Sequence, residues 1–140
     1  MVKFMSLLLD TSALVAARNV KDRNHNKALE VMMPALQGDY GKLFVTDYIF
    51  DEALTLAYVR TGSKKFAYDI GKFAKAKPIN FRFIEPIDFD KAWELYLQYE
   101  DKHLSFTDCT NIALMERLKI DTIFTFDMEF KGLVNLIALK

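Results

Sequence analysis

The hydrophobic positions of this chain fall into short apolar runs that alternate with longer stretches of helical periodicity. Short, mostly apolar runs predict buried strands at residues 4–9, 43–45, 80–84, 122–126 and 134–137. Between them, apolar side chains recur every three or four positions. This spacing predicts helices that begin at residue 12 and that cover residues 24–36, 48–60, 63–75, 88–99 and 107–118. We expect a loop over residues 100–106.

This alternation predicts an α/β protein with three layers, in which a central parallel sheet of four or five strands lies between helices. No internal repeat, low-complexity stretch or linker rich in proline and glycine interrupts the chain, so we expect residues 1–140 to form a single domain. In parallel sheets of this kind, functional sites lie at the carboxyl ends of the strands. Functional side chains are therefore expected directly after strands or at the starts of the helices that follow them.

The composition excludes some kinds of site and indicates the compartment of the protein. Cys109 is the only cysteine, which excludes an intramolecular disulfide and a zinc site built on several thiolates. Residues 4–9 are too short for a bilayer span, which needs about 20 residues, and they lack the pattern of a signal peptide. We therefore expect a cytoplasmic protein that does not enter a membrane.

The 19 basic and 19 acidic residues cancel, so the chain is not a strongly basic nucleic-acid binder. The charges are nevertheless segregated, because residues 60–82 are mainly basic and residues 85–108 are mainly acidic. Such a distribution suits a protein that holds a polyanion beside a cation-binding pocket. Two solvated helix faces would produce the same pattern.

Two acidic residues directly follow predicted strands. Asp10 comes after three leucines, and Asp127 comes after Phe126. A buried carboxylate is costly unless helix amides, a basic side chain or a metal compensate its charge. Each residue also has a structural interpretation, since Asp10 is well placed to cap the next helix and Asp127 to form a turn or cap.

Two further acids lie on predicted helices. Asp108 follows Ser105 by three residues, which is the spacing of a capping box, so a structural role competes with a functional one. Glu52 borders the apolar stripe of its helix, whereas Asp51 points further toward solvent. A carboxylate at the edge of the core needs a partner, and a salt bridge with Lys or Arg is the alternative to a metal.

Taken together, these four acids lie near the same predicted edge of one sheet. Clustered carboxylates repel one another unless a cation lies among them, and Mg²⁺ or Mn²⁺ prefers such oxygen ligands. The chemistry indicated is phosphodiester hydrolysis by metal-activated water. Ser12 and Thr125 each lie two residues from one of the acids and are candidates for orienting a carboxylate or a water molecule, with simple packing or capping as the alternative.

At these residues the sequence resembles the PIN-domain ribonucleases, specifically the VapC-type toxins of prokaryotic toxin–antitoxin pairs. The resemblance covers nearly the whole chain and rests on four blocks in order: LLDTS at 8–12, DYIFDEALTL at 47–56, LSFTDC at 104–109 and FTFDMEF at 124–130. It implies a PIN-like α/β/α fold with a parallel sheet of four or five strands. It also implies metal-dependent cleavage of single-stranded RNA, a homodimer, and inhibition by a small antitoxin.

The resemblance assigns roles residue by residue. Asp10, Glu52, Asp108 and Asp127 match the catalytic and metal-binding acidic quartet, with Asp51 as the rival of Glu52, while Ser12 and Thr125 match accessory polar positions. Basic residues in two segments are candidate RNA contacts, namely Arg18, Arg23, Arg60, Lys64 and Lys65. The expected function is thus an Mg²⁺- or Mn²⁺-dependent endoribonuclease that cleaves single-stranded or loop RNA as the toxin of a toxin–antitoxin pair.

Two other functions remain open on the sequence. One is a non-catalytic, PIN-like interaction module. The other is an aspartyl-phosphate phosphotransferase with Asp10 as nucleophile, although the haloacid-dehalogenase motif has a second Asp where this chain has Ser12. The sequence leaves the RNA target, the number of metals, the dimer interface and the antitoxin undetermined.

Overall fold

A five-stranded parallel sheet forms the centre of the molecule. The computed structural model describes residues 6–137 of the chain. In the sheet the strands lie in the order β3-β2-β1-β4-β5, and all neighbours are parallel. Their bounds are β1 Ser6–Leu9, β2 Lys42–Thr46, β3 Ile79–Arg82, β4 Thr122–Phe124 and β5 Leu136–Ile137. The predicted parallel sheet is confirmed, and the first residues of the predicted strand at 4–9 lie outside the described part.

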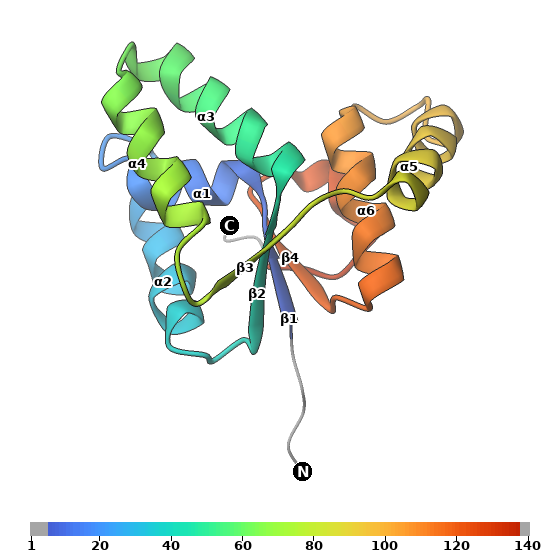
Figure 1. The fold of residues 1–140 in the computed structure, drawn as a ribbon, viewed down its shortest axis with the longest axis horizontal. Helices are drawn as coiled ribbons and strands as arrows, with labels where there is room; N and C mark the ends of the chain where they lie inside the picture. Colours follow the sequence, from blue (N-terminus) through green and yellow to red (C-terminus); the bar gives the residue numbers. More distant parts are fainter. Residues whose placement is uncertain (1–5, 138–140) are drawn as a thin grey trace.

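Within residues 6–137, six α-helices cover the sheet. Their bounds are α1 Thr11–Arg18, α2 His25–Leu36, α3 Asp47–Thr61, α4 Lys64–Ala74, α5 Pro86–Gln98 and α6 Phe106–Leu118. Figure 1 shows the strands between α1–α4 on the left and α5 and α6 on the right, which gives the three layers that the sequence predicts. The short 3-10 helix η1, Met128–Phe130, follows Asp127, where the sequence indicates a turn or cap.

Local signals in the sequence set the ends of several helices. The side chains of Thr46 and Ser63 accept hydrogen bonds from backbone N–H groups in the first turns of α3 and α4. Gly62 ends α3 with φ 68°, a left-handed conformation that glycine adopts without the cost of a side chain. Caps of this kind satisfy backbone groups that a helix end leaves unpaired.

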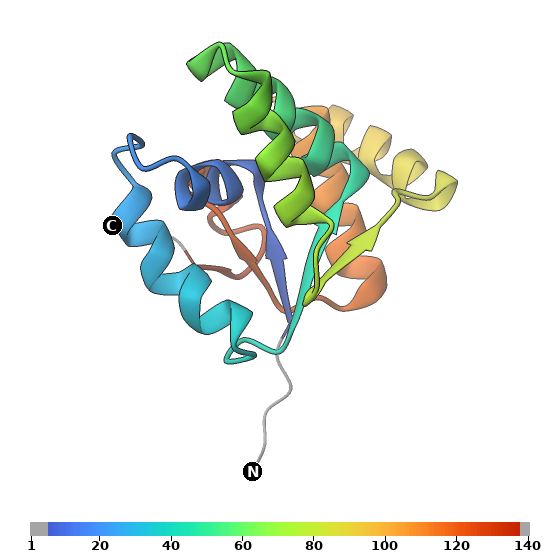
Figure 2. The ribbon, with the colours of Figure 1, turned by 60° about the vertical axis from the view of Figure 1, so that its left-hand side comes forward.

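The chain reverses its direction of winding between β1 and β4. From β1 it moves outward through β2 to β3, with α1–α4 as the connections. It then returns through α5 and α6 to β4, on the other side of β1, as the two views show (Figures 1 and 2). The crevice at the carboxyl ends of the strands at such a switch point is the usual ligand site of open α/β sheets.

The core surrounds β1. Leu7, Leu8 and Leu9 are completely buried, because helices cover both faces of the central strand. Among residues 6–137, no helix is both long and apolar enough to cross a membrane.

Candidate active site

Asp10 lies where β1 ends and α1 begins, and only 3% of its surface is exposed. It occupies the N-cap position of α1, but its side chain makes no capping hydrogen bond. Instead, Thr125 Oγ1 donates to Asp10 Oδ2 at 2.7 Å, and Asn111 Nδ2 donates to Asp10 Oδ1 at 3.3 Å. The structural interpretation as a helix cap therefore does not account for this side chain, and both of its oxygens face donors from other elements.

Two hydroxyl groups lie beside Asp10, that of Thr125 directly after β4 and that of Ser12 on α1. The backbone N–H of Asp10 donates to Phe124 O at 3.0 Å, which aligns the ends of the two strands. Ser12 Oγ lies 3.3 Å from Thr125 Oγ1 and accepts the backbone N–H of Phe126 at 2.9 Å. Since the Thr125 proton points to Asp10, Ser12 is the donor in its contact with Thr125.

Asp108 serves the helix that it lies on. It is 6% exposed in the first turn of α6, where it forms the predicted capping box with Ser105. The Ser105 backbone N–H donates to Asp108 Oδ2 at 2.9 Å, and the Asp108 backbone N–H donates to Ser105 Oγ at 3.0 Å. Within residues 6–137, Oδ1 of Asp108 has no hydrogen-bond partner, so the cap uses one carboxylate oxygen and leaves the other available.

Glu52 and Asp127 lie around the same edge. Glu52 is half-buried on α3 while Asp51 is exposed, as the helical pattern predicts. No Lys or Arg among the described residues forms a salt bridge with Glu52. Asp127 caps η1, because its Oδ1 accepts the backbone N–H of Glu129 at 2.9 Å, so its predicted capping role is confirmed.

The carboxylates are close enough to affect one another's protonation. The pKa of Asp10 is raised to about 7, chiefly by burial and in part by the negative charges of Asp108 and Glu52, against the opposing Thr125 hydrogen bond. Burial likewise raises the pKa of Asp108 to about 6, together with repulsion from Asp127 and Glu52. All four acids of the predicted quartet therefore contribute to one electrostatic environment.

The chemistry of this donor set fits a hard divalent cation. Every candidate ligand is a carboxylate oxygen, and the mutual repulsion of the carboxylates is what a bound cation would relieve. As the side chains lie, no three acidic, histidine or cysteine side chains among residues 6–137 form a group tight enough to hold an ion. Asp10, Asp108 and Glu52 are the residues whose carboxylates would have to draw together around it.

The candidate RNA contacts separate into two groups. Arg23 and Arg60 line a pocket of about 550 Å³ that Ser12 and Asp127 also border. The other three do not line it, and two of them lie against aromatic rings. The Arg18 guanidinium lies 4.8 Å from the centre of the Phe73 ring, and Lys64 Nζ lies 5.6 Å from that of Tyr58.

Sequence reasoning missed Asn111. This residue lies one helical turn after Asp108 on the buried face of α6, is completely buried, and holds Asp10 through its amide nitrogen. Its Oδ1 is buried without a hydrogen-bond partner among the described residues. An amide in an otherwise apolar helical stripe was the available signal, because a buried amide needs a polar partner.

Comparisons with known proteins show which family this chain and its fold resemble. The family model described as the PIN domain matches residues 7–135. A VapC ribonuclease of Archaeoglobus fulgidus is 30% identical over 128 residues, which cover 90% of this chain and 80% of that protein. The Mycobacterium tuberculosis VapC20 crystal structure, described as a Sarcin-Ricin loop cleaving toxin, superposes with a TM-score of 0.82 at 21% identity, over 91% of this chain and 94% of that one. A toxin-antitoxin complex from Klebsiella pneumoniae has a TM-score of 0.63 at 14% identity, over 94% and 96%.

Proposed function

Because this chain belongs to the PIN domain family, and within it to the VapC-type ribonucleases, we propose that it is a divalent-metal-dependent endoribonuclease. It cleaves single-stranded or loop RNA and acts as the toxin of a toxin–antitoxin pair. In this proposal residues 1–140 are one PIN-like domain. The observation that carries the proposal is the group of mutually repelling carboxylates at the crevice between β1 and β4.

In this proposal, the four acidic residues have different roles in binding the cation. Asp10, Glu52 and Asp108 would hold Mg²⁺ or Mn²⁺, and Asp127 would complete the pocket. The chemistry that such a cation would supply is activation of water for attack on the phosphodiester and neutralisation of charge on the phosphoryl group. Thr125 and Asn111 fix the orientation of the Asp10 carboxylate, and the capping box fixes that of Asp108.

The family and the surface charge indicate which molecules this chain binds. Arg23 and Arg60 are the candidate RNA contacts that share a pocket with Asp127, and Arg18, Lys64 and Lys65 remain candidate contacts outside that pocket. The toxin-antitoxin complex of the same fold from Klebsiella pneumoniae supports a small antitoxin as a partner of this chain. We further propose a homodimer, as is usual for this family.

The test is cleavage of unstructured and hairpin RNA by purified protein freed of any partner. We expect cleavage with Mg²⁺ or Mn²⁺, none with EDTA, and a loss of at least about 100-fold in Glu52→Gln and Asp108→Asn, as expected when a catalytic group is removed. Asp51→Asn is the matched control, because it removes an exposed carboxylate next to Glu52 on the same helix. Circular dichroism should show that all three variants fold.

Two results would contradict the proposal. One is cleavage that persists in EDTA or in Asp10→Asn. The other is absence of cleavage together with calorimetry that detects no binding of Mg²⁺ or Mn²⁺ by the wild type, which would identify a non-catalytic interaction module instead.

A further inference from the structure

The pocket beside the acidic site combines cationic, amide and aromatic side chains with two carboxylates and a hydroxyl. It measures about 550 Å³, which lies within the range of pockets that hold small organic ligands, roughly 300–1,000 Å³. Lys21, Arg23 and Arg60 supply positive charge, Asn24 supplies a side-chain amide, and Phe126 supplies an aromatic ring. A simple anion site would need only the cations. The amide and the ring indicate a ligand that also has a planar polar group.

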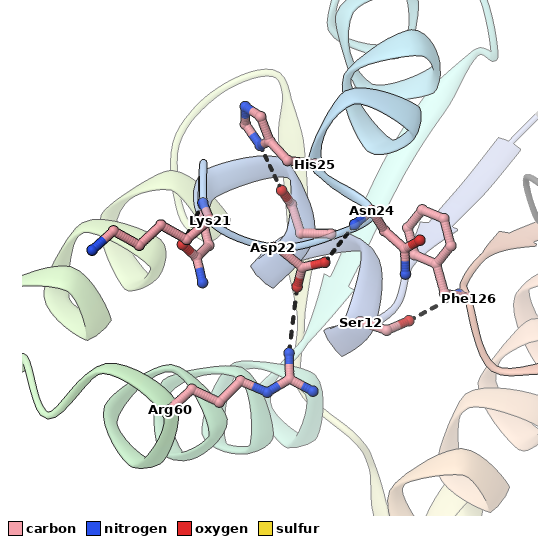
Figure 3. A network of polar contacts seen from close by, with 9 residues as sticks. Ser12, Lys21, Asp22, Asn24, His25, Arg60 and Phe126 are labelled. Carbon is pink, nitrogen blue, oxygen red and sulfur yellow. Dashed lines mark hydrogen bonds and ion pairs between the residues drawn. The ribbon is translucent and has the colours of Figure 1, made fainter.

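The loop between α1 and α2 is fixed in place around this pocket. Asp22 Oδ1 accepts the backbone N–H of Asn24 at 2.8 Å, and the His25 Nδ1 atom lies 2.8 Å from Ala16 O, within hydrogen-bond distance (Figure 3). Arg60 reaches across from α3 and its Nη1 donates to Asp22 Oδ2 at 3.4 Å. The first bond braces the loop internally, the second joins α2 to α1, and the third joins the loop to α3, so the pocket is largely formed before a ligand arrives.

The balance of charge in the pocket favours a phosphate. Asp22 is neutralised by Arg60, whereas Lys21 and Arg23 form no ion pair with any residue between 6 and 137. The remaining carboxylate at the pocket is Asp127, at its border with the acidic site. A phosphate that approaches the pocket therefore meets unpaired cations on the loop, and charge-assisted hydrogen bonds are the strong contacts in phosphate recognition.

The side chain of Asn24 does not cap the helix that it precedes. Asn24 is the N-cap residue of α2, a position at which asparagine usually bonds to the first turn, but here its side chain makes no capping bond. Figure 3 shows Asn24 projecting toward Phe126. Lys21 extends from the opposite side of the loop, and Arg60 reaches in from α3. An amide can pair with the donor and acceptor edge of a base, and an aromatic ring can stack on its face.

We propose that this pocket binds one nucleotide of the RNA directly beside the cleaved phosphodiester, with its base read by Asn24 against Phe126 and its phosphate held by Lys21, Arg23 and Arg60. The proposal rests on the endoribonuclease function, since the pocket adjoins the acidic site through Ser12 and Asp127. It assigns base selection at one position to Asn24. The cations contribute affinity that is independent of the base.

Base selection is tested by sequencing the ends that cleavage produces from a random RNA pool. We expect the wild type to prefer certain bases at a position beside the cut, and Asn24→Ala to lose that preference at this position alone. Asn26→Ala is the matched control, because Asn26 is exposed on the same helix and does not line the pocket. A preference that Asn24→Ala leaves as it is in the wild type overturns the proposal, and so does a wild type without any preference beside the cut.

Phosphate binding is tested separately from cleavage, with a fluorescein-labelled single-stranded RNA oligonucleotide and the inactive Asp108→Asn protein. Lys21→Gln and Arg23→Gln should each weaken binding, and the slope of log Kd against log salt should fall by about 0.7 for each phosphate that the variant no longer neutralises. Lys42→Gln is the control, since Lys42 is exposed at the amino end of β2, away from the pocket. Equal affinity and equal slope in all three variants overturn the proposal.

The two proposals fail in different ways. A wild type that cleaves RNA, together with pocket variants that match their controls, rejects the nucleotide pocket and leaves the endoribonuclease intact. A wild type that cleaves no RNA rejects the endoribonuclease, and the oligonucleotide affinities then decide whether the pocket binds RNA.

Discussion

At the scale of single residues, the defining feature is a carboxyl group that is buried with hydrogen-bond donors but without a cationic side chain. Thr125 and Asn111 stabilise the Asp10 carboxylate, yet burial and the neighbouring acids outweigh them and raise its pKa to about 7. A group of this kind destabilises the fold whenever it is charged. The folded protein therefore retains Asp10 at a cost in stability, which is typical of a residue kept for function.

The pH dependence of stability should reveal this cost. Between the ordinary aspartate pKa of 3.8 and the folded pKa of about 7, the folded protein binds more protons than the unfolded chain, so the free energy of unfolding falls as pH rises. Asp10→Asn removes the titrating group. Thermal unfolding in EDTA should therefore show that the variant gains stability over the wild type at pH 8, and gains less at pH 5.

The exposed acid Asp51 provides the control, because Asp51→Asn should change the melting temperature equally little at both pH values. Adding Mg²⁺ should raise the melting temperature of the wild type more at pH 8 than at pH 5. Identical differences between Asp10→Asn and wild type at the two pH values would contradict the prediction.

Asn111 should act on the cation through Asp10. Asn111→Ala removes the donor to Asp10 Oδ1, and loss of such an outer hydrogen bond typically costs about 10–100-fold in metal affinity. Calorimetric titration with Mn²⁺ measures this directly, without cleavage. Thr110→Val is the matched control, since Thr110 is also completely buried on α6 but its hydroxyl donates to Thr107 O.

If both α6 variants bind Mn²⁺ with the same affinity, Asn111 has only a packing role. Part of this residue's position was predictable, because the helical period places it on the buried face of α6. The amide contact with Asp10 was not, since it joins residues 101 positions apart and depends on how α6 lies against β1.

At the scale of elements, the start of α6 combines a structural and a chemical task. The capping box predicted from Ser105 and Asp108 is confirmed, and the same Asp108 contributes to the raised pKa of Asp10. The structural and the functional interpretation of Asp108 are therefore compatible, because the cap uses only one oxygen of its carboxylate. The cap fixes the orientation of Asp108 and leaves one oxygen for the cation that we propose to bind there.

Ser105→Ala should accordingly impair both stability and cleavage. Loss of the cap costs about 1 kcal/mol, and the loss of its hydroxyl leaves the Asp108 backbone N–H without its acceptor. Ser63→Ala removes an equivalent cap, the 3.1 Å bond from the Phe66 backbone N–H at the start of α4. Urea unfolding should show similar destabilisation in both variants, whereas cleavage should fall only in Ser105→Ala. A similar loss of cleavage in Ser63→Ala would assign the effect to stability alone.

The boundaries of most elements were predictable because their signals are local. Gly62 ends α3, and Thr46 caps it, as expected from residue type. Where η1 forms, the sequence indicated only a turn or cap at Asp127, because a single helical turn has no periodic pattern. The strands at 80–84 and 122–126 were predicted too long at their carboxyl ends, since the sequence does not show where the neighbouring strand stops.

At the scale of the whole molecule, the position of the site follows from the strand order. The apolar runs and the intervening helices indicate a parallel sheet, but they do not show that β1 lies between β2 and β4. The rule that functional side chains follow parallel strands grouped the four acids at one edge, and the resemblance to a known family assigned their roles. The switch between β1 and β4 gives the physical reason for the grouping. The net charge of zero likewise concealed the cationic pocket beside the acidic crevice.

The hydrogen bond between Thr125 and Asp10 also has a consequence for the timing of activity during synthesis. It joins residues 115 positions apart, so Asp10 is synthesised long before the residue that holds its carboxylate. A nascent chain on the ribosome that has not yet released β4 lacks Thr125 and Asp127, and one edge of β1 is unpaired. The candidate site therefore stays incomplete on the ribosome until β4 and the residues that follow it have emerged.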